Sequence, residues 1–460
     1  MLSGGDILKI SNDLGHDSIG RLLLNLSIPA IIAQLINALY NIVDRMYIGH
    51  IEGAGAAALT GVGITFPIII LISAFSMLVG MGGAPHASIR MGQGDNDAAE
   101  KILGNCFILL IILSIVLTSF FMVFKRPLLM LFGASEATLP YADDYLTIYL
   151  AGTVFVQMAL GMNAFINSQG FAKIGMMTVT IGAVLNIVLD PVFIFVFGMG
   201  VKGAAIATIL SQAVSAVWVL SFLFGKKTIL KIRPINFRLD HKIILPAVSL
   251  GLSPFVMQAT ESLINIVLNS SLQRYGGDIA VGSMTIITSI LQVIMMPLSG
   301  LGQGAQPIIG FNYGAKNFDR VKKTFRLLLI CSLSAAIFIW ALVMFFPRLF
   351  ISLFSNDPTL VEATVRAIRI FLSMIFMMGA QMACQQTFVA LGQAKISLFL
   401  ALLRKVILLI PLVYILSGPF GITGIFLSEP IADFTAATTT VCMFAYYAKH
   451  KLFKEKLPEQ

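Results

Sequence analysis

Asn186 and Asp190 place an amide and a carboxylate four positions apart, with Pro191 directly after them. Four positions make about one helical turn, so both side chains face the same way. The surrounding run, about 174–197, is apolar and long enough to cross the ~30 Å hydrocarbon core of a bilayer. A carboxylate there costs about 2.5–3.5 kcal/mol on insertion scales, so it normally faces a cavity or a partner and marks a pathway. Pro191 frees the carbonyl of Ile187 and can bend the helix. A polar pair that only packs helices, beside a tolerated kink, is the alternative.

A second polar stripe lies in the first apolar segment, about 23–44. Its members recur every three or four residues, which puts them on one helical face. They are Gln34, Asn37, Asn41 and Asp44, with Tyr40 on the turn before Asp44. Such a face looks into a cavity or another helix, not into lipid. Pro29 can bend this helix near one end. Amides that only join helices, or an Asp44 paired with Arg45 at the surface, are the alternatives.

The elements that would position these residues are membrane helices. The chain has 460 residues, of which 57% are hydrophobic and 12% charged. Apolar runs above twenty residues exclude a β-barrel, whose strands are ~10-residue alternating segments. We predict an all-α integral membrane fold with twelve transmembrane helices. The predicted spans are 23–44, 58–80, 102–123, 145–168, 174–197, 203–224, 245–271, 280–303, 325–346, 366–391, 396–417 and 422–447.

The placement of charge sets the expected orientation. The net charge of +9 invites a nucleic-acid interpretation, but the basic residues follow the loops. The tails and even-numbered loops hold 21 Lys and Arg, and the other side holds eight. This asymmetry predicts that both termini are cytoplasmic. No cleavable leader is recognisable before the first apolar run, so we expect that span to remain in the mature protein.

Residues of the first half recur in the second half at a constant spacing, which is the spacing between Gly80 and Gly302. Near the end of each copy this spacing is one position shorter. The matched glycine and proline pairs are Gly80/Gly302, Gly82/Gly304, Pro85/Pro307, Gly92/Gly314, Gly170/Gly392, Gly200/Gly421 and Gly203/Gly424. Six spans in each copy predict two bundles of the same orientation, related by a pseudo-two-fold axis along the membrane normal. We predict an N-terminal lobe at 1–225, a cytoplasmic linker at 226–243 and a C-terminal lobe at 244–460.

The two copies differ in their polar residues. Asn186 and Asp190 correspond to Leu408 and Leu412, and Thr208 corresponds to Glu429. Glu261, in the seventh span, is expected to line the cleft between the bundles. Glu429 is expected to be a buried partner of Arg404, and Asp433 follows it by one helical turn.

At these residues the chain resembles the MATE (multidrug and toxic compound extrusion) transporters, and more closely the DinF-like prokaryotic branch of that family. The similar segments are 40–44, 186–191, 203–208 and 429–433, and the resemblance covers nearly the whole chain. It implies a cation-coupling site in the N-terminal lobe, a helix-bending proline at Pro29 and cleft residues at Asn37 and Tyr40. The coupling site would consist of Asp44, Asn186, Asp190 and Thr208. Other branches carry an acid in the tenth span, where this chain has only glutamines, and that departure favours the N-terminal lobe.

We therefore expect a secondary active antiporter that expels amphipathic, often cationic organic compounds in exchange for H⁺ or Na⁺ by rocking-type alternating access. A carboxylate in a low-dielectric cleft resists ionisation, so a proton can bind it near neutral pH. Alternatively, the two acids hold a sodium ion with the oxygens of Asn186 and Thr208. An entering organic cation would compete for the same negative charge. No other cofactor is expected.

The main alternative function is a flippase for a lipid-linked oligosaccharide, whose pyrophosphate calls for a basic cleft. An intramembrane enzyme is disfavoured, because the five histidines are scattered and no metalloprotease motif is present. We expect small amphipathic organic cations and membrane lipid as partners, no nucleic acid, and a monomer in the prokaryotic cell (inner) membrane.

Overall fold

The computed structural model describes residues 12–452 apart from 54, 355 and 356, and all regular structure among these residues is helical. Residues 1–11 of the predicted N-terminal lobe and residues 453–460 of the predicted C-terminal lobe lie outside the described residues. In the N-terminal half the helices are α2 (Ile19–Gly49), α3 (Gly55–Gly92), α4 (Asn96–Leu131), α5 (Leu139–Ala151), α6 (Thr153–Ser168), α7 (Ala172–Pro191), the π-helical turn η1 (Val192–Val196) and α8 (Gly200–Phe224). A short 3₁₀ turn, η2 (Pro234–Asn236), lies in the connection to the second half.

The C-terminal half begins with α9 (His241–Gly314) and α10 (Phe318–Phe345). It continues with α11 (Pro347–Ile351), α12 (Pro358–Phe371), the 3₁₀ turn η3 (Ile375–Met377), α13 (Met378–Ala390), α14 (Ala394–Leu402), the π-helical turn η4 (Leu403–Leu409), α15 (Ile410–Tyr447) and the π-helical turn η5 (Ala448–Leu452).

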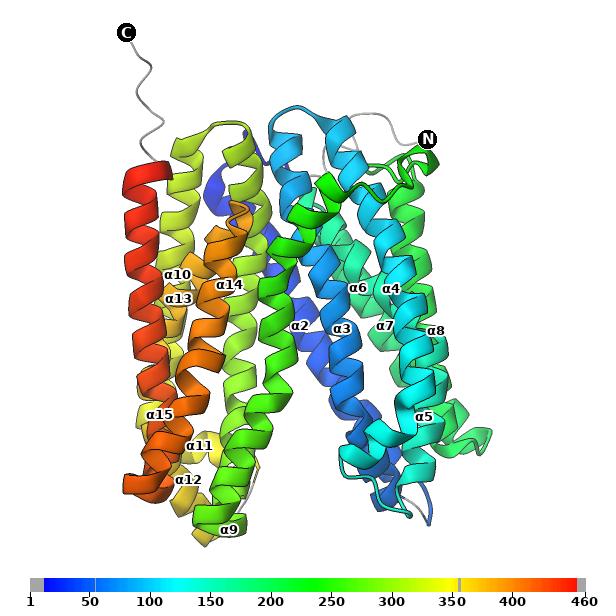
Figure 1. Cartoon of the computed structure of the whole chain (residues 1–460), viewed down its shortest axis with the longest axis vertical. Coiled ribbons are helices and arrows are strands. Elements are labelled where there is room, and N and C mark those ends of the chain that lie inside the picture. Colours follow the sequence, from blue (N-terminus) through cyan, green and yellow to red (C-terminus); the bar gives the residue numbers. More distant parts are fainter. Residues whose placement is uncertain (1–11, 54, 355–356, 453–460) are drawn as a thin grey trace.

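These helices make twelve membrane crossings among the described residues. Six single helices are long and apolar enough to cross alone, and two bent pairs, α5 with α6 and α12 with α13, make one crossing each. The other four come from α9 and from the run α14 to η5, which each turn back at a glycine, as Figure 1 shows. Gly277 and Gly421 have φ values of 61° and 58°, a region that side chains with a Cβ atom rarely adopt. The predicted twelve-helix fold is therefore confirmed.

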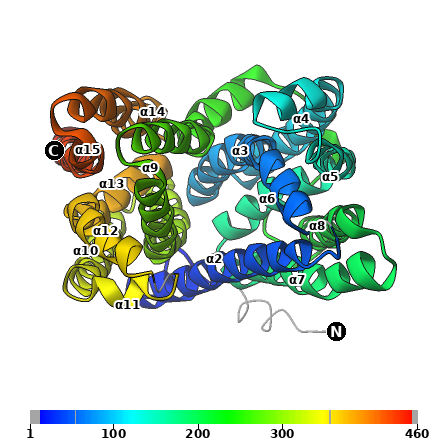
Figure 2. The same ribbon diagram turned by 90° about the horizontal axis from the view of Figure 1, so that it is seen from below.

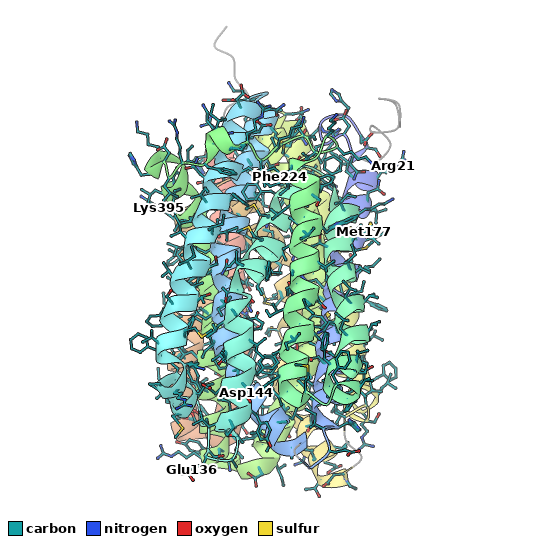
Figure 3. The ribbon with its side chains drawn as sticks, turned by 90° about the vertical axis from the view of Figure 1, so that its right-hand side faces the viewer. Arg21, Glu136, Asp144, Met177, Phe224 and Lys395 are labelled. Atoms are coloured by element: carbon teal, nitrogen blue, oxygen red, sulfur yellow. The ribbon has the colours of Figure 1, made fainter. Side chains whose placement is uncertain are left out.

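Charged residues mark the two ends of the molecule. In Figure 3, Arg21 and Lys395 lie at the upper end, whereas Glu136 and Asp144 lie at the lower end. The start of α2 and the end of α15 share the upper end of Figure 1. One buried cluster there contains Leu22 from α2 together with Phe444 from α15. We call this the terminal end of the molecule.

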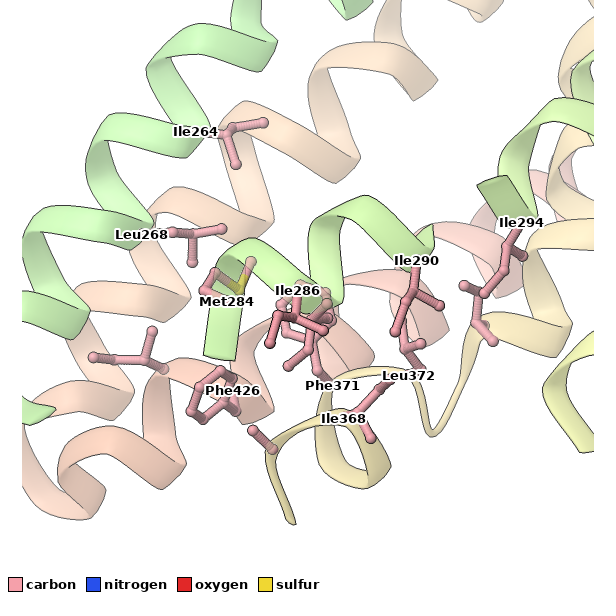
Figure 4. Packing of buried hydrophobic residues seen from close by; sticks show 14 of the residues in the cluster. Ile264, Leu268, Met284, Ile286, Ile290, Ile294, Ile368, Phe371, Leu372 and Phe426 are labelled. Carbon is pink, nitrogen blue, oxygen red and sulfur yellow. The ribbon is translucent and has the colours of Figure 1, made fainter. Parts of the chain in front are cut away.

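Each half has its own apolar interior. In the C-terminal half, side chains of α9, α12 and α15 form a buried cluster that includes Ile290, Phe371 and Phe426 (Figure 4). The first helix of each half also reaches into the other half. Leu26 of α2 belongs to a cluster of the C-terminal half, and Ala247 of α9 belongs to a cluster of the N-terminal half. Seen from below, the two halves stand side by side with α2 running along both (Figure 2).

The connection between the halves is fastened to the N-terminal half. Gln169, which is buried, accepts hydrogen bonds through Oε1 from the backbone N–H groups of Ile229 and Leu230, at 2.9 and 2.8 Å. Glu100 on α4 accepts a bond from the Lys231 N–H and forms an ion pair with Arg233 at 2.7 Å. This segment was predicted only as a basic linker, and these anchors were not anticipated.

Candidate functional site

The predicted coupling residues converge inside the N-terminal half. Asp44 lies on α2, Asn186 and Asp190 lie on α7, and Thr208 lies on α8. All four are buried, with exposed fractions of 7, 2, 0 and 7% respectively. Two acids and two neutral polar groups from three helices therefore share one buried position.

Asn186 is hydrogen-bonded to two other residues of this cluster. Its Nδ2 donates to Asp190 Oδ1 at 3.2 Å and to Thr208 Oγ1 at 3.4 Å. The Thr208 hydroxyl donates to the carbonyl of Ala204 at 3.0 Å, so its lone pairs face the amide. One turn of α7 separates Asn186 from Asp190, and this spacing allows the bond between them. The carboxyl groups of Asp44 and Asp190 are themselves in hydrogen-bonding contact.

Three oxygens of the cluster lack a donor among the described residues. They are Asp44 Oδ1, Asn186 Oδ1 and Asp190 Oδ2, and all are buried. A buried acceptor without a partner is costly, and two buried carboxylates in contact cannot both be ionised without compensation. A proton shared between the acids would satisfy them, as in other carboxyl dyads. A small cation that prefers oxygen ligands would satisfy them too. No group of three or more His, Cys, Asp or Glu suited to a metal occurs in the described part of the chain, so such a cation would depend on Asn186 and Thr208.

A cavity of about 50 Å³ adjoins the cluster. Asn37 and Tyr40 of α2, Asn186 of α7 and Thr208 of α8 line it, together with further polar residues, namely Asn163, Thr178, Ser211, Gln212 and Ser215. A water molecule needs roughly 10–15 Å³ of such space, so the cavity can hold a few waters or a small ion. A drug-sized ligand needs a pocket of roughly 300–1,000 Å³. The cavity therefore suits the exchange of an ion or proton.

The structure separates the predicted cleft residues. Asn37 and Tyr40 line the cavity, whereas Gln34 is not among its lining residues. The Asn41 amide donates to the carbonyl of Asn37 in its own helix, at 2.6 Å. Glu261 lies on α9 in the other half, where its carboxylate is bound to the Lys405 ammonium. The structure thus brings the coupling residues together with two of the five predicted cleft residues.

The two prolines predicted to bend helices sit differently. Pro29 is buried within α2, which is a continuous helix of 31 residues here. Pro191 is the last residue of α7, and the π-helical turn η1 follows it directly. The missing N–H of Pro191 accounts for the change of helix type at this point.

Sequence reasoning missed two tyrosines of α5 beside the cluster. The Tyr145 hydroxyl lies near Thr208, and the Tyr149 hydroxyl lies near Ser73. Their rings stack with centroids 6.3 Å apart. The four-residue spacing of two tyrosines at the start of a span was visible, but tyrosine is common at membrane interfaces and gave no specific signal.

Comparisons with known proteins agree on one family. The MatE family model matches the chain over residues 29–192 and over residues 254–415. The multidrug export protein MepA of Staphylococcus haemolyticus is 24% identical over 429 residues, which cover 93% of this chain and 92% of that protein. The FAD transporter of Shewanella oneidensis is 28% identical over 445 residues, which cover 93% of this chain and 94% of that protein.

Solved structures show the same likeness. The MATE multidrug transporter DinF-BH is 37% identical, with a TM-score of 0.88 over 95% of this chain and 98% of that one. A MATE protein in a bent conformation is 24% identical, with a TM-score of 0.90 over 99% of each chain, and shows the fold alone.

Proposed function

The chain belongs to the MATE family of multidrug efflux transporters, whose model matches both of its halves, and on this premise we propose that it is an antiporter that exchanges organic cations for H⁺ or Na⁺. The observation that carries the proposal is the set of three buried acceptor oxygens on Asp44, Asn186 and Asp190. They need a proton or a cation to balance them, and an entering organic cation supplies the same charge. Competition for that charge couples the two movements.

The packing of the halves supports rocking-type alternating access. Helices α3 and α9 touch at the terminal end, where a Cβ atom on Gly82 would lie 2.0 Å from the Ala247 carbonyl oxygen. Phe75 and Phe255 form an edge contact nearer the middle, with centroids 5.0 Å apart. Toward the other end the ribbons of the two halves diverge (Figure 1). We propose that this state is closed at the terminal end and that transport requires these contacts to open.

The charge of the coupling site, for which the substrate competes, favours cations as substrates. The Shewanella relative is named as an FAD transporter, and FAD carries phosphates that call for basic partners. No Lys or Arg is among the residues that line the cavity, whereas the adjoining cluster contains two acids. The same argument disfavours a lipid-linked oligosaccharide.

The proposed setting is the cell (inner) membrane, with both termini in the cytoplasm, membrane lipid around the helices, and a monomer as the working unit. The excess of Lys and Arg in the tails and even-numbered loops supports this orientation. Accessibility of single cysteines placed in loops on either side tests it.

Efflux of a fluorescent organic cation from intact cells tests the coupling site. We expect Asp190→Asn and Asp44→Asn each to reduce pumping at least about tenfold, because a neutral amide cannot exchange a charge, which corresponds to about 1.4 kcal/mol or more of lost coupling. Asp144→Asn is the matched control, since Asp144 lies on α5 outside the cluster. Unchanged pumping by both site variants at normal expression would contradict the proposal.

The coupling ion is identified in vesicles with imposed gradients. If pumping persists after the proton gradient is collapsed and depends on a sodium gradient, the ion is Na⁺. If it stops and sodium has no effect, the ion is H⁺.

A further inference from the structure

A network of ion pairs lies within the C-terminal half, at membrane depth. Arg404 of η4 donates through Nε to Asp433 Oδ1 at 2.6 Å and through Nη2 to Glu429 Oε1 at 2.8 Å. Both acids belong to α15, and the side chains of Arg404, Asp433 and Glu429 are 15, 4 and 8% exposed. The salt bridge between Arg404 and Glu429 was expected from the sequence. Asp433 as a second partner was not.

The next residue repeats the pattern on another helix. Lys405 donates through Nζ to the carbonyl of Met257 at 3.2 Å and to the carboxylate of Glu261, both on α9. Its side chain is 12% exposed, whereas that of Glu261 is 54% exposed. Consecutive residues of an α-helix point in different directions. Arg404 and Lys405 lie in the π-helical turn η4, where the directions of consecutive side chains differ from those in an α-helix. Such turns are frequent at functional sites.

The network occupies the position in the C-terminal half that corresponds to the cavity in the N-terminal half. The offset that matches the two copies of the sequence relates four members of the network to residues of the N-terminal half. The equivalent pairs are Gly182/Arg404, Ala183/Lys405, Thr208/Glu429 and Gln212/Asp433. All four N-terminal members line the cavity beside the coupling site. Where the first half has a small residue and an open space, the second half has a basic side chain.

The correspondence between the two halves also holds for the first helix of each half. A Cβ atom on Gly82 would meet the backbone of Ala247, and one on the equivalent Gly304 would meet that of Ser27. Ser27 and Ala247 therefore correspond, at an offset two positions shorter than that of the glycines. The same shorter offset relates Asn37, which lines the cavity, to Met257, which binds Lys405.

We infer that Arg404 and Lys405 are tethered cations, which permanently occupy in the C-terminal half the place that an exchangeable cation takes in the N-terminal half. This inference rests on the proposed function for the meaning of the N-terminal site. Buried acids need compensation in both halves. A covalently attached cation cannot leave with the transport cycle, so the second half carries no ion and only the first half exchanges one.

Removing a tethered cation should vacate a site for a free one. Arg404→Ala removes the atoms of ethylguanidinium, and Lys405→Ala removes those of propylammonium. We expect the purified Arg404→Ala protein to have a lower melting temperature than the wild type and to regain several degrees on addition of millimolar ethylguanidinium. Lys405→Ala should respond in the same way to propylammonium. A ligand that binds only the folded state stabilises it in proportion to the logarithm of its concentration.

The two variants serve as controls for one another. Each should respond more strongly to its own cation than to the other, and the wild type should respond to neither. Equal responses of variant and wild type to both cations would overturn the inference. If Arg404→Ala does not fold with or without ethylguanidinium, the Lys405→Ala measurement decides alone.

Failure of the proposed function would look different. Asp190→Asn should reduce pumping at least about tenfold, yet its melting temperature should not respond to ethylguanidinium, because Arg404 still fills its site. Normal pumping by Asp190→Asn would refute the coupling site in the N-terminal half. A specific response of Arg404→Ala to ethylguanidinium would still show a filled cation site in the other half.

Discussion

Gly92 packs against the carbonyl oxygen of Phe311, and Gly314 packs against the carbonyl oxygen of Ile89. Gly314 lies one repeat after Gly92, and Phe311 lies one repeat after Ile89. A Cβ atom would lie 1.9 Å from the oxygen at Gly92 and 2.0 Å from the oxygen at Gly314. The ends of α3 and α9 thus make two equivalent close contacts, which we call the glycine crossing and which join the halves at the terminal end.

Alanine at either glycine should loosen this crossing. The obstructing atoms belong to the backbone, so the helices must move apart, and overpacking of this kind costs about 1–3 kcal/mol. We expect Gly92→Ala and Gly314→Ala to lower pumping and to expose Ser88, a buried neighbour that donates to the Pro307 carbonyl at 3.2 Å. Labelling of a cysteine at position 88, with the four native cysteines replaced, measures the opening.

Gly63→Ala is the matched control for this crossing. Gly63 lies in α3, and nothing lies within 4 Å of a Cβ atom placed there. Alanine should be neutral or slightly stabilising at this helical position, because it is the better helix former by about 1 kcal/mol. Equal labelling of position 88 in the Gly63, Gly92 and Gly314 variants would contradict the role given to the crossing.

The two tyrosines of α5 allow a residue that acts on the coupling site to be distinguished from one that only packs beside it. Tyr145→Phe removes the hydroxyl that lies near Thr208, and Tyr149→Phe removes the one that lies near Ser73. We expect Tyr145→Phe to change the concentration of H⁺ or Na⁺ that gives half-maximal pumping by about three- to tenfold, because it removes a polar group beside the site and such contacts contribute ~0.5–1.5 kcal/mol. Tyr149→Phe should leave that concentration unchanged. An identical effect of both variants would mean that Tyr145 acts only through packing.

Gln169 should control the order of the connection between the halves. Gln169→Leu leaves the backbone N–H groups of Ile229 and Leu230 without their acceptor, at about 1–3 kcal/mol for the buried group of Leu230 and less for that of the exposed Ile229. We expect faster hydrogen exchange at these two amides while α8 stays protected. Gln93→Leu, an exposed position, is the control and should change exchange nowhere in this connection. Slow exchange at both amides in the Gln169 variant would show that packing alone holds the segment.

The sequence predicted the repeat because its glycines perform the same task twice. Gly170 and Gly392 have φ values of 87° and 70°, and Gly200 and Gly421 have values of 54° and 58°. Only glycine adopts this region readily, so the matched positions are visible without a structure. The convergence of Asp44 with Asn186 was likewise predictable, because a polar group in an apolar span must face a partner.

Other features leave no such trace in the sequence. No pattern in the sequence indicates the π-helical turn at Arg404 and Lys405. The sequence predicts Glu429 as a partner of Arg404 but does not indicate that Asp433 is a second one. The role of Gln169 was equally unpredictable, because the three groups that donate hydrogen bonds to its Oε1 come from a distant segment that follows α8. Hydropathy locates a span, whereas long-range bonds are set by how the spans pack.

The segment before α2 crosses the terminal end and should act as a strap. The Asn12 amide donates to the carbonyl of Gly170 in the N-terminal half at 3.0 Å. In the C-terminal half, Arg320 donates through Nη2 to the carbonyls of Leu14 and Asp17, at 3.1 and 2.7 Å. Arg320→Leu removes both bonds to the strap. We therefore expect faster hydrogen exchange over residues 13–18 and, because the strap joins the halves, easier opening of the terminal end.

Cysteine labelling at position 88 reads that opening directly, as it does for the glycine crossing. Arg326→Leu is the control, since Arg326 lies further along α10 and is exposed. It should alter neither the exchange nor the labelling. If Arg320→Leu speeds exchange over 13–18 but leaves position 88 as protected as in the wild type, the strap does not help to keep this end closed. The direct contacts between the halves, such as the glycine crossing, would then be sufficient.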